Sequence, residues 1–199
     1  MSDFPDQLRD GCARVSRWFA WVGGAMILGS ATLITLDVMV RNLVQSTYFE
    51  SFELSGYAFA ISTSFGLAYA FFSKAHIRIE VLYNLLPKKM RAWFDVLSVL
   101  TLAMVALTLT YWCAHTVLQS GANGARSNST LGLLMVIPQS MWLLGLAWFA
   151  FVASAAASVA LVRVLRGRID AITAELGVST LDEEISASLD TAPSTTPKA

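Results

Sequence analysis

The ionisable side chains of this 199-residue chain are few and lie at the ends of its apolar segments. Asp37 and Arg41 are four residues apart, so they can form an ion pair across one helical turn. Glu53 opens the next apolar segment, where the dipole of a helix N-terminus favours an acid. An ionisable group in the middle of such a segment would indicate a proton or cation pathway. Its absence there disfavours an ion carrier.

Histidine and cysteine offer the main alternative chemistry, that of a membrane redox or enzyme subunit using His115 and Cys113. The other histidine, His76, falls in a different connection, so a haem held by two histidines within one membrane is geometrically poor. The chain also lacks a GxSxG nucleophile elbow and an HExxH zinc motif. We therefore expect no catalytic residue, no cofactor and no metal ligand, and a self-associating four-helix scaffold remains a further alternative.

Composition favours lipid as the main solvent of this chain. Hydrophobic residues make up 55% of it and charged residues only 14%, against about 25% charged in an ordinary soluble domain. The mean hydropathy is +0.57. Fourteen basic residues balance fourteen acidic ones, so no basic excess favours a nucleic-acid partner.

Four apolar segments are long enough to cross a bilayer, for which a helix needs about 20 residues. The sequence therefore predicts an all-α integral membrane protein with four transmembrane helices. We expect a cytoplasmic N-terminal segment at residues 1–17 and a cytoplasmic tail at residues 163–199, largely disordered from about residue 180. The expected spans cover residues 18–36, 54–72, 94–118 and 138–162.

Basic residues indicate how these spans are oriented. Eleven of the fourteen Lys and Arg residues flank the chain ends or lie between the second and third spans. Only Arg41 and Arg126 fall in the other two connections. Because cytoplasmic loops are enriched in Lys and Arg, both termini are predicted to be cytoplasmic.

Two connections are predicted to lie along the membrane surface. Apolar residues from Ile77 to Leu86 alternate with charged ones before the third span, which suits a segment in the headgroup layer. Residues 131–137 extend the fourth span beyond the length of one straight crossing. Their first turn or two should therefore lie along the outer surface, with a bend at Pro138.

Small residues indicate where helices approach closely. Ala58, Ser62, Gly66 and Ala70 recur every four residues in the second span, and residues 153–158 form a second small-residue surface. The first ridge could pack within the chain or against a separate membrane protein. Candidate residues for a partner interface are Arg41, Glu53, Ala58, Ser62, Gly66, Ala70, His76, Arg78 and Glu80.

Glu50 has a simpler interpretation. Thr47 and Glu50 fit a capping box at the start of the second span, with Glu50 as its acidic member.

Several of these residues, in order, resemble a known family. Val38-Met39-Val40-Arg41, Glu53, Gly66, His76-Ile77-Arg78-Ile79-Glu80, Pro87 and Ser129-Thr130-Leu131-Gly132-Leu133 are similar to the small membrane subunit of tripartite ATP-independent periplasmic (TRAP) transporters, the DctQ-type family. The resemblance covers roughly residues 18–162.

The resemblance implies a secondary transporter of three proteins in the bacterial inner membrane. A large multi-span subunit would couple sodium to the import of organic acids, and a periplasmic binding protein would deliver the carboxylate substrate. This multi-pass chain would brace the large subunit without using a cofactor of its own.

Overall fold

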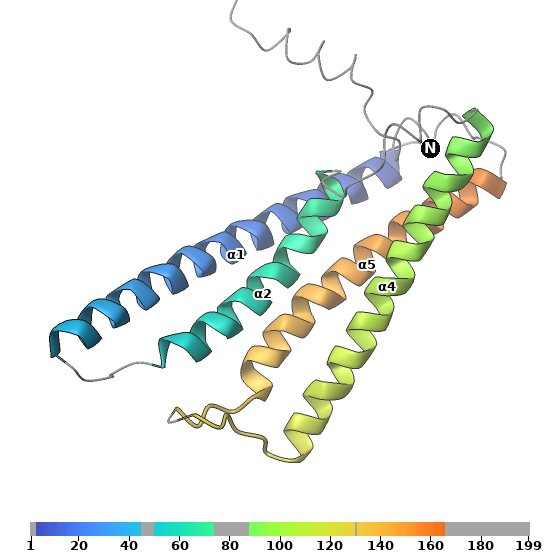
Figure 1. Cartoon of the computed structure of the whole chain (residues 1–199). Helices are drawn as coiled ribbons and strands as arrows, with labels where there is room; N and C mark the ends of the chain where they lie inside the picture. Colours follow the sequence, from blue (N-terminus) through green and yellow to red (C-terminus); the bar gives the residue numbers. More distant parts are fainter. Residues whose placement is uncertain (1–2, 45–49, 74–87, 130, 166–199) are drawn as a thin grey trace, which may run out of the picture.

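The computed structural model consists of four long helices and describes residues 3–44, 50–73, 88–129 and 131–165 (Figure 1). The helices are α1 (Asp3–Val44), α2 (Ser51–Phe72), α4 (Lys88–Ala122) and α5 (Val136–Leu165). Among the described residues, the only strand-like pairing is one isolated antiparallel bridge between Arg126 and Leu134. The predicted all-α class is therefore confirmed.

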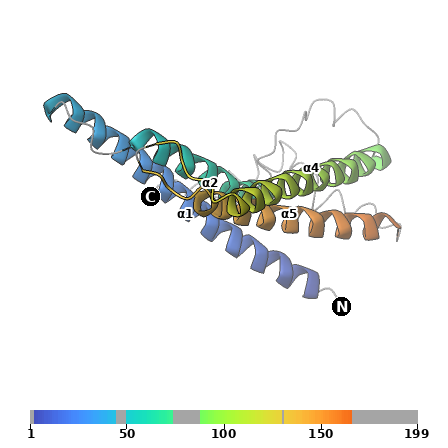
Figure 2. The same cartoon turned by 90° about the horizontal axis from the view of Figure 1, so that it is seen from below.

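The helices are spread into a single layer. In space α1 packs on α2, α2 on α5 and α5 on α4, so the last helix lies between the second and the third described ones. Figure 2 shows the helices side by side rather than gathered around a common axis. One end of the layer holds the C-terminus of α1, the N-terminus of α2 and the α4–α5 connection (residues 123–135). We call it the connection end.

Glycines set the closest approaches between helices. A Cβ atom at Gly23 of α1 would lie 3.1 Å from the backbone oxygen of Ser62 in α2. A Cβ atom at Gly145 of α5 would lie 2.7 Å from Cδ1 of Phe65 and 2.9 Å from the carbonyl carbon of Ser64. The contacts at Gly145 leave no room for a Cβ atom, so that crossing needs glycine, whereas a Cβ atom at Gly23 would require α2 to move by a few tenths of an ångström.

Aromatic rings join α1 to α2 and, at one point, to α5. Phe19 stacks on Phe65 of α2 with 4.7 Å between the ring centroids, and its edge meets Trp148 of α5 at 6.0 Å. Trp148 also donates a hydrogen bond of 3.0 Å from Nε1 to Ser16 Oγ, which is fully buried. Beside these rings lies an apolar groove of about 490 Å³.

The α4–α5 pair is held together by small side chains. Val99, Ala103 and Ala106 of α4 share one buried cluster with α5. The α5 members include Ala150, Ala153 and Ala157, so the predicted small-residue surface at residues 153–158 packs against α4. A hydrogen bond of 3.1 Å from Thr110 Oγ1 to the Leu146 carbonyl adds a polar contact between the two helices.

Three of the four helices are long and apolar enough to cross a membrane by length and composition alone. These segments are Arg9–Leu43, Trp93–Ala122 and Val136–Val164. Helix α2 is shorter, at 22 residues, and contains several serines, of which Ser51, Ser62 and Ser64 are buried. The four-span count and the orientation remain predictions.

Two expectations about the connections have different outcomes. The predicted bend at Pro138 is wrong, because α5 already begins at Val136 and Pro138 occupies its first turn. The backbone N–H groups in the first turn of a helix have no acceptor within the helix. Proline lacks this N–H, so it fits in the first turn without a bend. The chain instead reverses at Gly132, whose φ is +52°. The predicted surface segment at residues 77–86 lies outside the described residues.

Candidate functional site at the connection end

Asp37 joins α1 to α2. Its Oδ2 atom accepts one hydrogen bond of 2.8 Å from Arg41 Nη2 and another of 2.7 Å from Ser51 Oγ, the first residue of α2. The Asp37 side chain is 2% exposed and that of Arg41 is 55% exposed. The predicted ion pair is thus confirmed within one turn of α1, and the hydrogen bond from Ser51 to Asp37 joins α1 to α2.

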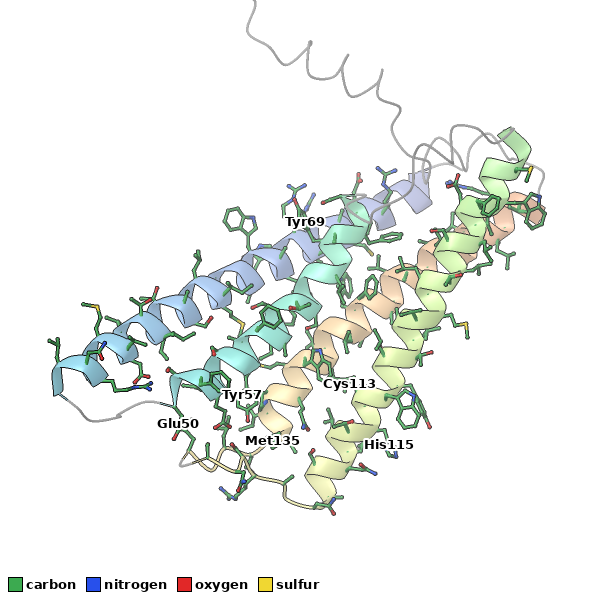
Figure 3. The ribbon with its side chains drawn as sticks, viewed as in Figure 1. Glu50, Tyr57, Tyr69, Cys113, His115 and Met135 are labelled. Atoms are coloured by element: carbon green, nitrogen blue, oxygen red, sulfur yellow. The ribbon has the colours of Figure 1, made fainter. Side chains whose placement is uncertain are left out.

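Glu53 joins α2 to the α4–α5 connection through Tyr57. The Tyr57 hydroxyl donates a hydrogen bond of 2.5 Å to Glu53 Oε1, one helical turn away. The same hydroxyl lies 3.3 Å from the sulfur atom of Met135 at the end of the connection. Figure 3 shows Tyr57 and Met135 close together at the connection end.

The connection also presents polar groups to the Glu53 carboxylate. The hydroxyls of Ser127 and Ser129, and then that of Tyr57, hold the pKa of Glu53 below its usual value. The carboxylate oxygen Oε2 is buried and has no hydrogen-bond partner among the described residues. The two serines therefore stabilise the ionised form by proximity, whereas Tyr57 makes a formed hydrogen bond.

The connection itself is a compact hairpin. Ser127 donates its backbone N–H to the Leu133 carbonyl at 2.8 Å, and Met135 donates to the Ala125 carbonyl at 3.0 Å. Arg126 Nη1 donates to the Gly132 carbonyl at 3.1 Å. Because these bonds lie within the connection, its hairpin is formed by its own groups, and Tyr57 contacts Met135 where the connection meets α2.

The predicted ridge on α2 is divided between two environments. Ser62 is buried against Gly23 of α1, whereas a Cβ atom at Gly66 would meet no heavy atom within 4 Å. Helix geometry explains the division, because a step of four residues advances about 40° around the helix. The ridge therefore turns away from α1, and half-buried Ala58 and Ala70 lie at its two ends.

The remaining candidates are placed as follows. His76, Arg78 and Glu80 lie outside the described residues. Cys113 is buried at 4% exposure, and exposed His115 meets Trp112 edge to face with 5.9 Å between the ring centroids. No cluster of three metal-ligating side chains occurs within the described parts of the chain. The polar groups at the connection end thus join helices and are not arranged as a metal centre.

Sequence reasoning missed the two hydroxyl partners, Ser51 and Tyr57. The four-residue spacing of Glu53 and Tyr57 is a detectable signal, since such pairs face each other on a helix. The sequence carries no such signal for Ser51, because its partner Asp37 lies fourteen residues away on another helix. The capping prediction for Glu50 is also wrong. Helix α2 begins only at Ser51, and the Glu50 side chain makes no capping hydrogen bond.

Comparison with known proteins gives one match. Residues 30–167 match the family described as "Tripartite ATP-independent periplasmic transporters, DctQ component". No curated protein and no solved structure matches the chain. The matched range includes Asp37 and Glu53 of the connection end and the whole of helices α2, α4 and α5.

Proposed function

The chain belongs to the DctQ component family of tripartite ATP-independent periplasmic transporters, and from this premise we propose that it braces the large subunit of such a transporter. A DctQ component is the small membrane subunit of the transporter and is not an enzyme. The large subunit would couple sodium to the uptake of organic acids, which a periplasmic binding protein delivers. This chain would supply a fixed surface in the inner membrane.

The use of the carboxylates supports a bracing role. Asp37 is engaged by Arg41 and Ser51, and Glu53 is engaged by Tyr57. Transport sites in membranes instead use ionisable groups or broken helices exposed to a pathway. Here the described acids of the connection end join elements of the chain to each other, as expected of a rigid support.

The open face of α2 is the observation that supports docking most directly. We define this face by Gly56, Phe59, Thr63, Gly66 and Ala70, which lie on one side of the helix. A Cβ atom at Gly56 or at Gly66 would meet no heavy atom within 4 Å, and Phe59 is 66% exposed. Small residues let helices approach closely in lipid, so this face suits a helix of the large subunit.

Replacing Gly66 by Leu tests the docking face. A bulky side chain there should weaken association with the large subunit by about 1 to 3 kcal/mol, a typical cost of overpacking. Since about 1.4 kcal/mol changes an association constant tenfold, co-purification with the large subunit at equal expression should detect the loss. Ala70→Leu, on the same face, should act similarly.

Gly24→Leu is the matched control. Gly24 is also a helical glycine with no heavy atom within 4 Å of its Cβ position, but it lies on α1. Gly24→Leu should leave co-purification unchanged. Equal retention of the large subunit by the Gly66→Leu and Gly24→Leu variants would rule out the open face of α2 as the docking surface.

Reconstitution tests the accessory role itself. The purified chain in vesicles should neither take up organic acids nor dissipate a sodium gradient, whereas the complete three-protein system should do both. Sodium-dependent uptake by this chain alone would overturn the proposal. Stable assembly of the chain only with itself, with the large subunit present, would favour the scaffold alternative.

The proposed orientation follows the distribution of basic residues. Eleven Lys and Arg residues lie on the side that contains both termini, which we assign to the cytoplasm. All four helices, including the less apolar α2, would then cross the inner membrane. The connection end would face the periplasm.

A further inference from the structure

We propose that Glu53 and Tyr57 form a latch that fixes the α4–α5 connection against α2, so that the connection is held in one orientation relative to the helix layer. The latch consists of the Tyr57 hydroxyl between Glu53 Oε1 and Met135 Sδ, together with the Ser127 and Ser129 hydroxyls near the carboxylate. Both latch residues are on α2, and the groups they hold belong to the connection.

The position of the latch makes it separable from the packing of the helices. Helices α2 and α5 meet through Gly145, Ser64 and Phe65, which lie well along α2 from Tyr57. The connection retains its own hairpin bonds, including those from Ser127 to Leu133 and from Met135 to Ala125. Loss of the latch should therefore release an intact hairpin from an intact helix layer.

The hydrogen bond of Tyr57 is the strongest single contact of the latch. Its acceptor is a carboxylate, and charge-assisted hydrogen bonds are stronger than neutral ones. The Tyr57 hydroxyl has one hydrogen, so while it donates to Glu53 the Met135 sulfur makes only a close contact of 3.3 Å with the hydroxyl oxygen, and this contact reaches the connection. The hydroxyl of Tyr57 and the charge of Glu53 should both be required.

A fixed connection matters most in a three-protein transporter, so the biological meaning of the latch rests on the proposed function. The connection would lie on the periplasmic side, where its orientation decides which groups it presents to the other two proteins. The physical inference, however, concerns this chain alone and can be tested without them.

Spin labels can measure the orientation of the connection. In the full chain with Cys12 and Cys113 replaced by Ala, cysteines at Gly56 on α2 and Asn128 in the connection would carry one label pair. A second pair, at Gly24 on α1 and Thr101 on α4, would report the helix layer; all four residues are exposed. Electron spin resonance of the labelled chain in lipid nanodiscs then gives both distance distributions.

Glu53→Gln and Tyr57→Phe should each broaden the distribution between positions 56 and 128. Tyr57→Phe removes the hydroxyl that contacts Met135, and Glu53→Gln removes the carboxylate that binds this hydroxyl, so the released population should rise by about two- to tenfold, the effect of losing one ordinary hydrogen bond. The distribution between positions 24 and 101 should stay unchanged. Thr63→Val is the matched control, because the Thr63 hydroxyl binds only the Phe59 carbonyl of its own helix.

Two results would overturn the latch. An unchanged distribution between positions 56 and 128 in both variants would show that the connection is held by other contacts. If the distance distributions of both label pairs broaden, Glu53 and Tyr57 stabilise the whole fold and do not act on the connection alone. Neither result depends on the large subunit, so failure of the latch leaves the accessory role to its own test.

Discussion

Asp37 and Glu53 lie at the ends of apolar helices, and each has a role that depends on neighbouring hydroxyl groups. Asp37 is 2% exposed and accepts hydrogen bonds from a cation and a serine. Glu53 combines a tyrosine hydroxyl with two serines. Unpaired charges are costly near a membrane interior, so these partners allow the acids to join helices there. At this scale the four-residue spacing predicted the Arg41 pair, whereas partners on other elements could not be deduced from spacing.

Substitution at the ion pair should have unequal effects. Arg41→Ala leaves the buried Asp37 carboxylate with only Ser51, whereas Asp37→Asn leaves an exposed arginine that water or headgroups can solvate. Arg41→Ala should therefore lower the thermal midpoint in detergent micelles more than Asp37→Asn does. In the double variant the loss should be smaller than in Arg41→Ala alone. The reverse order of the two single variants would contradict this account.

The latch should respond to acid in a defined direction. The pKa of Glu53 is lowered by Ser127, Ser129 and Tyr57, so its ionised form is the one that the folded chain stabilises. This contribution is complete above the ordinary glutamate pKa of about 4.3 and is lost as the pH falls through the lowered value. Over that range Tyr57 stays neutral, because its hydrogen bond to Glu53 raises the pKa of its hydroxyl.

The spin-label distances between positions 56 and 128 provide the measurement. Their distribution should be narrow from pH 8 to about pH 5 and should broaden only below about pH 4.3. The Glu53→Gln variant should show no such acid response. Broadening already near pH 6 would contradict a lowered pKa for Glu53.

At the scale of helices, small residues serve two different purposes. Gly23 and Gly145 are filled sites, where backbone or rings of α2 occupy the space of a side chain. Gly56 and Gly66 are open sites on the same helix that those contacts use. The sequence predicted that small residues mark close approaches, but it could not separate filled from open sites. That distinction depends on which helix lies beside α2, and even within the four-residue repeat of α2 Ser62 is buried whereas Gly66 is open.

A pair of alanine substitutions should separate these two kinds of glycine. Gly145→Ala places a Cβ atom against Phe65 and the backbone of Ser64, and should cost about 1 to 3 kcal/mol of unfolding free energy. Gly66→Ala adds the same methyl group in open space, where the higher helix propensity of alanine gains up to about 1 kcal/mol. Unfolding of the isolated chain in mixed micelles measures both. Equal losses in the two variants would contradict the close crossing at Gly145.

At the scale of the whole molecule, the chain is a layer and not a closed bundle. Apolar periodicity and length predicted the four helices, because each is a long uninterrupted segment. Their order in space, α1–α2–α5–α4, could not be predicted, because short connections are compatible with several antiparallel arrangements. That order is also what brings the α4–α5 connection to Glu53.

Thiol labelling tests the proposed orientation of this layer. In the cysteine-free chain, Asn42→Cys and Asn128→Cys should react with an impermeant thiol reagent added to intact cells, because both would lie in the periplasm. Asp10→Cys, near the other end of α1, should react only after the cells are opened. All three side chains are exposed in the structure, so burial does not limit the reaction. Labelling of all three in intact cells would overturn the orientation.

The spatial order of the helices also has a consequence for biosynthesis. Among the described helices α2 is the shortest and contains buried serines, and one of its two neighbours, α5, is the last of them to leave the ribosome. During synthesis α2 therefore has α1 on one side but waits through the translation of about sixty residues for α5 on the other. Until then that side of α2 lacks the packing that α5 provides. A chain truncated before Val136 should consequently be degraded quickly, although three of its four helices would already have been made.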